Sequence, residues 1–388
     1  MHSARAGSVF FLALLAAGTA DLNGQSSIFG ARGLGFPLRP ISTHARATGD
    51  AFGLFDGESS LNPASLGDAR AVVAGFSVVP SWRRTTTNAG NTTLRETTFP
   101  LTYVFGPIGE SPVAVGLSIA GYADRDFSFA SRYTVSVRGV QVPVFDTLAS
   151  LGGLSEIRLA GAYRLGAGTV VGGGFHIITG SSRISARRGF ADSSYLPIRS
   201  SVEQSYAGVG FSIGLLQRVG RSVAVAALAR SDGRARVDND STFVYRVDLP
   251  YTFGLGARLL AGRRVLLAAS GLYHTWSSAN SDLLAQGGVG ARNTVEGSFG
   301  LEVARSLRHP AHFPLRLGVR YATLPFPVTS GDQPHQFSVS GGTGARFGHD
   351  RAGVDLAFDY AWRSATGPER ERALTLTLGL SIKPFGAR

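Results

Sequence analysis

The feature that most constrains the fold is a period-two alternation of apolar residues with small or polar ones. Residues 374–382 read LTLTLGLSI and residues 354–362 read VDLAFDYAW. The same alternation runs through 157–165, 251–259 and 313–321. Successive side chains of a β-strand point to opposite faces of its sheet, so each segment predicts a strand with one apolar face.

These segments run to about ten to thirteen residues, the length that a tilted strand needs to cross a bilayer, whereas strands of soluble proteins are usually shorter. We expect about fourteen such strands, an even number as in bacterial outer-membrane barrels. They are expected at residues 70–82, 95–106, 112–124, 154–166, 168–180, 202–217, 221–231, 249–261, 263–277, 293–306, 313–324, 334–347, 351–363 and 371–384.

The connections between the expected strands alternate between long and short. Segments 83–94, 125–153, 181–201, 232–248 and 278–292 are long, and the segments between them, such as 107–111 and 218–220, are short. Short periplasmic turns and long outer loops are typical of transmembrane barrels. Trp82, Trp276 and Trp362 fall near the outer ends of strands, as an interfacial aromatic belt requires, although Trp276 has the parity of the inward face. The predicted fold is all-β, a transmembrane antiparallel up-and-down barrel.

Within a bilayer the strands must close on one another, because hydrocarbon offers no hydrogen-bond partner. The apolar face then meets lipid, and the other face lines the lumen. The charged residues with inward parity are Arg158, Arg164, Arg258, Arg316, Arg320, Arg363, Glu296, Glu302, Asp355 and Asp359. They are expected either to form a structural ladder of arginines and carboxylates or, in part, to bind an anionic head group of a ligand.

The first 25 residues have the pattern of an export signal. Arg5 precedes an apolar stretch at residues 9–17, and Gly18-Thr19-Ala20 supplies small residues for cleavage. No later stretch reaches about 18 uninterrupted apolar residues, the length of a membrane helix. We therefore expect a signal peptide at 1–25, a separate segment at 26–69, a barrel at 70–388, and a location in the outer membrane of a Gram-negative-type bacterium.

Composition excludes several kinds of site. The chain has no cysteine, which excludes disulfides and metal–thiolate centres. The net charge is +12, but the arginines are dispersed, so we expect outer-membrane lipids rather than nucleic acid as partners. Gly210-Phe211-Ser212-Ile213-Gly214 matches a hydrolase motif, yet Ser212 lies mid-strand, and His176 and His274 cannot be paired with it by spacing. We expect no enzyme activity, no cofactor and no metal site.

A short acidic loop gives a weak metal signal. Asp238-Asn239-Asp240 offers oxygen ligands for Ca²⁺, but it lacks the spaced carboxylates of a dedicated calcium loop. We interpret it as a solvated acidic loop.

Residues 44–66, HARATGDAFGLFDGESSLNPASL, follow neither a helical nor an alternating pattern. Placed between an export signal and a barrel, this segment is a candidate plug. It resembles a stretch of the outer-membrane long-chain fatty-acid transporter family (FadL-like), which includes type IX secretion barrels. The resemblance rests on an A-R-A element, a G-x-A-F element, an acidic pair and an N-P-A-x-L element, here residues 45–47, 49–52, Asp56 with Glu58, and 62–66.

The resemblance implies a fourteen-stranded barrel whose N-terminal hatch blocks the lumen, with a ligand that leaves sideways beside a kinked third strand. Gly116 and Gly121 lie in that strand. The hatch residues it implies are Arg46, Gly49, Phe52, Asp56, Asn62 and Pro63. The expected function is passive uptake of hydrophobic or amphipathic small molecules such as long-chain fatty acids. The alternative is a component of a secretion system that binds exported proteins.

Overall fold

The computed structural model describes residues 20–21, 27–88, 90–166, 168–307, 311–328 and 332–384. Almost all of the expected signal peptide, residues 1–25, lies outside this part of the chain. Each expected strand overlaps one strand of the barrel. The barrel strands are β3 (Val73–Thr87), β4 (Gly90–Pro107), β5 (Val113–Asp124), β7 (Val140–Arg164), β8 (Thr169–Phe190), β9 (Ile198–Val219), β10 (Val223–Ser231), β13 (Tyr251–Ala261), β14 (Val265–His274), β15 (Thr294–Val303), β16 (Leu315–Thr323), β17 (His335–Phe347), β18 (Ala352–Ser364) and β19 (Arg370–Ile382).

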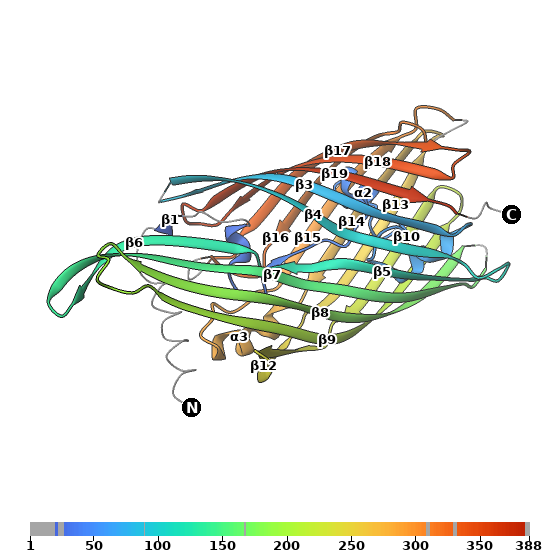
Figure 1. Cartoon of the computed structure of the whole chain (residues 1–388). Helices are drawn as coiled ribbons and strands as arrows, with labels where there is room; N and C mark the ends of the chain where they lie inside the picture. Colours follow the sequence, from blue (N-terminus) through green and yellow to red (C-terminus); the bar gives the residue numbers. More distant parts are fainter. Residues whose placement is uncertain are drawn as a thin grey trace.

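The strands form one closed antiparallel barrel (Figure 1). Each barrel strand pairs with the next one along the chain, and β19 closes the sheet by pairing with β3 from Arg370↔Thr86 to Ile382↔Ala74. The short turns and the C-terminus lie at one end of the barrel, and the long hairpins project from the other. The predicted fold class is confirmed.

Four of the expected outer loops are wrong, because residues 83–94, 125–153, 181–201 and 232–248 contain strands. Residues 83–87 and 90–94 belong to the outer ends of β3 and β4. The other three segments form β6 (Phe127–Val137), the outer parts of β7, β8 and β9, and the hairpin of β11 (Arg234–Asn239) and β12 (Thr242–Asp248). The barrel ladder continues outward into a projecting sheet, and Phe127, Leu148 and Ile184 give that sheet a small core. Its sequence alternates less clearly because neither face meets hydrocarbon.

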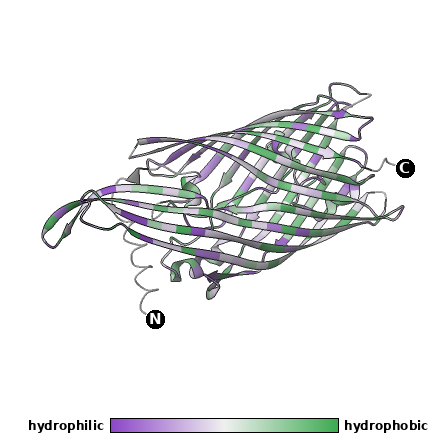
Figure 2. Cartoon of the chain, in the orientation of Figure 1, coloured by the Kyte–Doolittle hydropathy of each residue, from purple (hydrophilic) through white to green (hydrophobic). Residues whose placement is uncertain are grey.

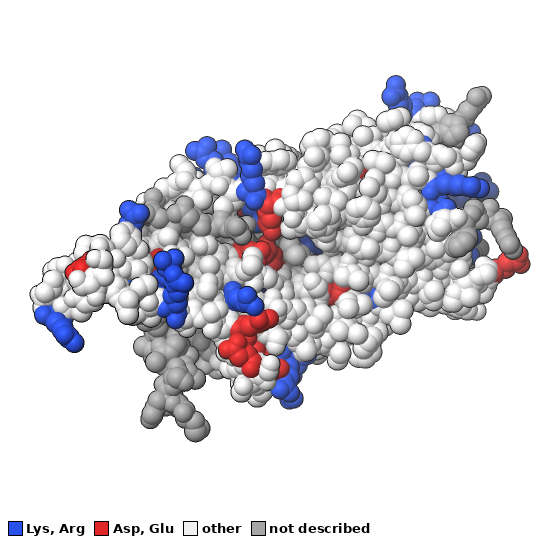
Figure 3. Space-filling view, viewed as in Figure 1, with Lys and Arg blue, Asp and Glu red and all other residues white. Residues whose placement is uncertain are grey.

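The outer surface of the barrel is apolar around its middle. Large exposed side chains such as Leu159, Phe211 and Leu255 point outward, and hydrophobic residues recur along the strands in Figure 2. Charged side chains gather toward the two ends and leave a mostly uncharged middle in the view of Figure 3. Trp82 and Trp362 point outward, as expected, with 38% and 39% of their surface exposed.

Trp276 does not belong to the aromatic belt. It begins a short helix, η3 (Trp276–Ala279), which continues into α3 (Asn280–Ala285). Its side chain is buried edge-on against Phe326. The inward parity of Trp276 therefore described its environment correctly, although it lies just beyond its strand. In the described part of the chain, no helix is long and apolar enough to cross a membrane.

Residues 27–69 lie inside the barrel. They contain η1 (Ile28–Gly30), β2 (Phe36–Pro37), α2 (Thr43–Ala47) and η2 (Pro63–Asp68), and a two-residue strand, β1 (Ala20–Asp21), pairs with β6. The helix α2 packs against β16 to β19, whereas η2 packs against β7, β8 and β9. Residues 27–69, called the hatch below, therefore extend from one side of the lumen to the other.

Candidate functional site

Two capped turns give the hatch its shape. Ser42 precedes α2, and its side chain accepts a hydrogen bond of 3.0 Å from the backbone nitrogen of Ala45. Asn62 caps η2 in the same way, accepting from the nitrogen of Ala64 at 3.0 Å, while Pro63 occupies the first helical position, where no donor is needed. The Asn-Pro pair of the motif is thus the start signal of η2.

Glycines in the barrel wall let the hatch approach closely on one side. A Cβ at Gly214 would lie 1.9 Å from the Asn62 Oδ1, and a Cβ at Gly172 would lie 2.5 Å from the Ala64 nitrogen. The Asn62 side chain donates to the carbonyl of Leu54 at 3.0 Å. Asn62 therefore both caps its own turn and seats the hatch on β8 and β9.

The opposite wall receives the hatch in the same manner. A Cβ at Gly318 would lie 2.0 Å from the carbonyl carbon of Thr48, and one at Gly300 would lie 2.4 Å from the Thr48 oxygen. Gly49 and Asp50 adopt positive φ angles of 64° and 72° at this contact. The turn at Gly49 and Asp50 therefore needs residues that tolerate a positive φ, and it needs glycines on β15 and β16 to leave room for its backbone.

Ion pairs join the hatch to the wall. Asp50 accepts from Arg39 within the hatch, and its carboxylate lies 3.2 Å from Arg320 of β16. Arg320 also binds Glu296 of β15 at 2.6 Å. Because these groups are largely buried, each charge needs its partner, and the network favours one seated position of the hatch.

A second network connects the hatch to the wall through His44. Its Nε2 lies 2.9 Å from the Glu302 carboxylate, and its Nδ1 lies 3.2 Å from Asp56. Arg316 binds Glu302 at 2.7 Å and Asp355 at 2.5 Å. Burial and the nearby Arg316 lower the pKa of His44, but the charges and hydrogen bonds of Glu302 and Asp56 outweigh them and raise it to about 9.

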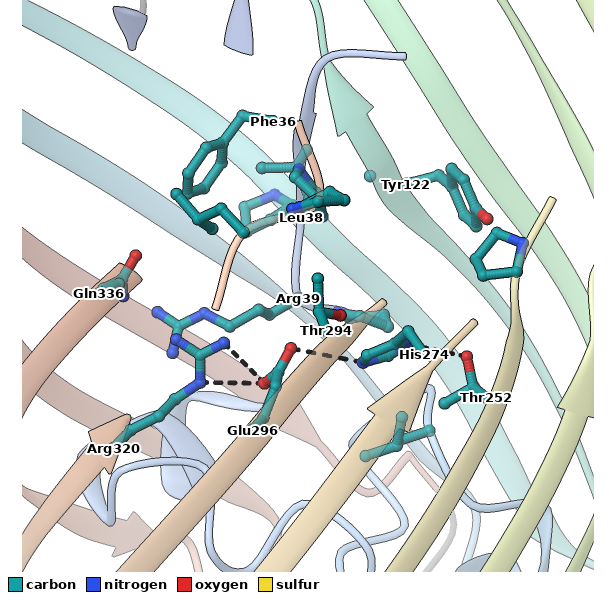
Figure 4. A pocket seen from close by; sticks show the side chains of 18 of the residues that line it. Phe36, Leu38, Arg39, Tyr122, Thr252, His274, Thr294, Glu296, Arg320 and Gln336 are labelled. Atoms are coloured by element: carbon teal, nitrogen blue, oxygen red, sulfur yellow. Dashed lines mark hydrogen bonds and ion pairs between the residues drawn. The ribbon is translucent and has the colours of Figure 1, made fainter. Parts of the chain in front are cut away.

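A cavity of about 160 Å³ lies between the hatch and the barrel wall (Figure 4). Its apolar lining includes Phe36, Leu38, Leu61, Val79 and Leu324. On its other side Arg320, Glu296, His274 and Thr252 form a continuous chain of hydrogen bonds and ion pairs. The cavity is therefore amphipathic, with an apolar half and a strongly polar half.

The cavity reaches the wall where the third barrel strand departs from its neighbour. β5 pairs with β4 only from Leu101↔Ala120 to Pro107↔Ala114. In the described chain no strand pairs with residues 90–100 of β4 on the side away from β3. Thr98, Pro100, Gly121 and Tyr122 line the cavity at this place. The wall thus lacks part of its ladder beside the cavity.

Gly121 marks a departure of β5 from a regular strand. The register between β5 and β7 shifts between Gly121 and Ala123, and β2 of the hatch pairs with the end of β5. A Cβ at Gly121 would lie 2.5 Å from the Leu38 Cδ1. This glycine therefore permits both the bulge and the close packing of the hatch, as the resemblance implied for the third strand.

The predicted lumen residues all lie inside the barrel but do not form one site. Of the ten inward charged residues predicted above, Glu296, Arg320 and Arg363 line the cavity. The other seven do not, namely Arg158, Arg164, Arg258, Arg316, Glu302, Asp355 and Asp359. Arg164 donates to the hatch carbonyl of Gly67 at 2.6 Å, and the Arg258 guanidinium lies 5.2 Å from the centre of the Phe55 ring. Their contacts fit the structural alternative for these residues, and a role in ligand binding stays a prediction.

The sequence analysis did not predict a buried network of side chains that joins β7, β8, β9 and β10. His176 lies 2.8 Å from Glu156 and 2.8 Å from Ser212, and Arg230 binds Glu156 at 2.7 Å. The order Ser–His–acid is that of a hydrolytic triad. However, His176 is 0% exposed, and neither it nor Ser212 lines the cavity described above. Parity would have placed Glu156 inside, but pairing it with His176 requires the register.

Carboxylates suitable for a cation occur together at one place in the described chain. Oxygen atoms of Glu96, Asp124 and Asp126 lie within 4.8 Å of one another. Arg83 already pairs with Glu96 at 3.1 Å, and Asp126 accepts a backbone hydrogen bond from Gly152. Asp238 pairs with Arg236 at 2.8 Å, so the acidic loop has its own counter-ion.

A closed antiparallel barrel with an apolar belt and a plugged, polar interior is a transmembrane β-barrel of the outer-membrane class. No protein-family model matches the sequence, and a comparison with curated proteins finds no match. Solved structures do show the fold. A FadL homologue of Pseudomonas aeruginosa has 13% sequence identity and a TM-score of 0.61, with 90% of this chain and 99% of that chain covered.

Two hydrocarbon channels have the same fold. The monoaromatic hydrocarbon channel CymD has 16% identity and a TM-score of 0.56, with 91% of this chain and 99% of that chain covered. The toluene transporter TodX of Pseudomonas putida has 13% identity and a TM-score of 0.57, with 90% and 99% covered. The chain therefore has the plugged-barrel fold of these outer-membrane proteins.

Proposed function

We propose that the protein is a passive outer-membrane transporter for hydrophobic or amphipathic small molecules. The observation that carries the proposal is the cavity beside the hatch, which meets the wall where residues 90–100 of β4 have no described strand on the side away from β3. An apolar ligand held there has a short path into the bilayer, which an open aqueous channel does not offer. The hydrocarbon channels of the same fold support this class of ligand.

We infer that an acid such as a long-chain fatty acid is the preferred ligand. Arg46 of the hatch lines the cavity and is 8% exposed. Its Nη2 donates to the carbonyl of Arg39 at 3.0 Å, while its Nε has no hydrogen-bond partner among the described residues. A carboxylate would supply the missing acceptor for a buried guanidinium.

Uptake by cells that carry the protein tests the proposal, with a labelled long-chain fatty acid, its methyl ester and toluene as probes. Val79 of β3 faces the cavity, whereas its neighbour Val78 pairs with Leu378 on the outward face. We expect Val79→Trp to lower the uptake several-fold because the ring fills the cavity. The matched control Val78→Trp should leave uptake unchanged.

The probes separate the two parts of the proposal. Equal loss of uptake for acid, ester and toluene in Val79→Trp would support a hydrophobic channel without preference for acids. Preferential uptake of the acid that is lost in Arg46→Gln would support the carboxylate contact. No uptake of any probe above that of cells without the protein would contradict the transport function.

The compared structures support neither a secretion component nor an enzyme. The compared proteins are a FadL homologue and two hydrocarbon channels, and none of them is a secretion component. They are also transporters or channels rather than enzymes. Glu156 and Arg230 of the Ser212 network line the described cavity, but Ser212 and His176 do not, so the cavity does not present the serine to a substrate.

A further inference from the structure

Four exposed arginines occupy the outer face of three neighbouring strands, β19, β3 and β4, at their extracellular ends. They are Arg84, Arg95, Arg370 and Arg372. Arg372 lies directly opposite Arg84 across the ladder that closes the barrel. One pleat nearer the membrane, Trp82 lies opposite Leu374 and also opposite Arg95. In Figure 3, basic side chains stand at this end of the barrel.

None of these four arginines has an ion pair among the described residues. The neighbouring acids Glu96 and Glu371 point inward, where they pair with Arg83 and Arg363. Like charges directly opposite each other destabilise a pair of strands. The juxtaposition of Arg84 and Arg372 therefore lacks a compensating anion within the part of the protein that the structure describes.

The position of the four arginines relative to the membrane follows from the aromatic belt. Trp362 pairs with Arg372, and Trp82 precedes Arg84 by two residues. Tryptophan marks the boundary between hydrocarbon and head groups. Two residues span about 7 Å along a strand, and less along the membrane normal because barrel strands are tilted. The guanidinium groups thus stand at the level of the lipid head groups, facing lipid.

We propose that this surface binds the phosphate groups of an anionic glycolipid of the outer leaflet, such as lipopolysaccharide. Arginine forms short, charge-assisted and often bidentate hydrogen bonds with phosphate. One phosphate between Arg84 and Arg372 turns a repulsive cross-strand pair into two attractive contacts. The surface lies outside the lumen, so this inference does not depend on the transport function.

The projecting sheet supplies a matched control. Arg187 of β8 lies directly opposite Arg199 of β9, and both are exposed, so this pair has the same chemistry and the same cross-strand geometry. However, it lies ten residues beyond Ile177 and Val209, the outermost pair of large aliphatic side chains that are both exposed on these strands. That separation is about 33 Å along the strand, well above the phosphates nearest the bilayer.

The test is a thermal-shift titration of the full-length barrel in non-ionic detergent. The probes are bisphosphorylated lipid A and the same lipid without its phosphates. A ligand that binds the folded state raises the melting temperature. We expect the half-saturating concentration of lipid A to rise about tenfold or more in Arg84→Gln/Arg372→Gln, because charged hydrogen bonds are lost. The control Arg187→Gln/Arg199→Gln should titrate like the unchanged protein.

The outcomes separate specific binding from general charge. A loss confined to the Arg84/Arg372 variant, with little response to the dephosphorylated lipid, supports the proposal. Equal titration of both variants and the unchanged protein overturns it, as does an equal response to the lipid without phosphates. Without lipid, the Arg84/Arg372 variant should melt no lower than the unchanged protein, because its substitutions remove a repulsion.

Discussion

At the scale of single residues, wall glycines decide where the hatch can lie. Gly172 and Gly214 receive the Asn62–Ala64 turn on one side, and Gly300 and Gly318 receive residues 48–49 on the other. Backbone and short side chains of the hatch occupy the space that a Cβ would need. Specific ion pairs can form between hatch and wall only after this close approach.

A valine at position 214 should displace the hatch. Its Cβ would overlap the Asn62 side chain, and overpacking a buried contact lowers the free energy of unfolding by about 1–3 kcal/mol. Thermal melting and limited proteolysis of residues 27–69 would measure the effect. Gly297→Val is the control, because no heavy atom lies within 4 Å of the place that its Cβ would take. Equal melting temperatures for the two variants would contradict the proposed seat.

His44 should make the stability of the protein depend on pH. The folded-state pKa of about 9 exceeds the ordinary 6.5, so the stabilisation is complete below pH 6.5 and is lost as the pH rises through about 9. We therefore expect the melting temperature to fall over that range more steeply than in His44→Gln. Parallel curves for the two proteins would show that His44 does not titrate with folding.

Glu58 should add a second pH-dependent contribution at lower pH. Burial and the nearby carboxylates of Asp56 and Asp355 raise the pKa of Glu58 from 4.5 to about 7. A raised folded-state pKa gives stabilisation that is present below pH 4.5 and is lost as the pH rises through about 7. The melting temperature should fall across this interval, and Glu58→Gln should flatten the curve. An unchanged slope in the variant would assign the effect to another group.

At the scale of elements, β5 and the strands beside it combine two different tasks. The β4–β5 ladder ends at Leu101↔Ala120, and β5 continues by pairing with β7 and with β2 of the hatch. On the far side, β7 to β10 are cross-linked in the interior by Glu156, His176, Ser212 and Arg230. The hydrogen-bond ladder of the wall is therefore incomplete beside the cavity, whereas side-chain contacts join the strands that follow.

Ser212→Ala should lower the free energy of unfolding and should not remove a catalytic activity. The substitution leaves the buried His176 without its Ser212 contact of 2.8 Å, and losing one partner of a buried polar pair costs about 1–3 kcal/mol. A fluorophosphonate probe should label neither the unchanged protein nor the variant. Labelling that is present in the unchanged protein and absent from Ser212→Ala would instead establish a nucleophilic serine.

At the scale of the whole molecule, the strand ladder of the barrel closes without the hatch, although hydrogen bonds such as those of β2 with β5 join the two. The ladder from β3 round to β19 closes without a strand of the hatch. The hatch in turn depends on the wall, because it is seated by wall glycines and by ion pairs such as Asp50–Arg320. The barrel strands can therefore pair without the hatch, whereas the hatch needs the barrel wall to hold it in place.

Deletion of Ser26–Leu66 should leave a folded barrel with an open lumen. Every barrel strand keeps both neighbours in the ladder except where β4 already lacks one. We expect the single-channel conductance in planar bilayers to rise markedly above that of the full-length protein, and selectivity among hydrophobic probes to fall. Unchanged conductance and flux would show that these residues do not block the lumen.

Local patterns in the sequence were enough to predict the number of barrel strands, their apolar and polar faces, and a separate segment before the barrel. The alternation at 354–362 and 374–382 is a local property, and hydrocarbon requires every such strand to pair. Which inward residues contact each other depends on the tertiary structure. Glu156 contacts His176, Arg320 pairs with Asp50, and the cavity forms beside Gly121 because of the strand register and the path of the hatch. These depend on contacts between residues far apart in the chain, which no local period records.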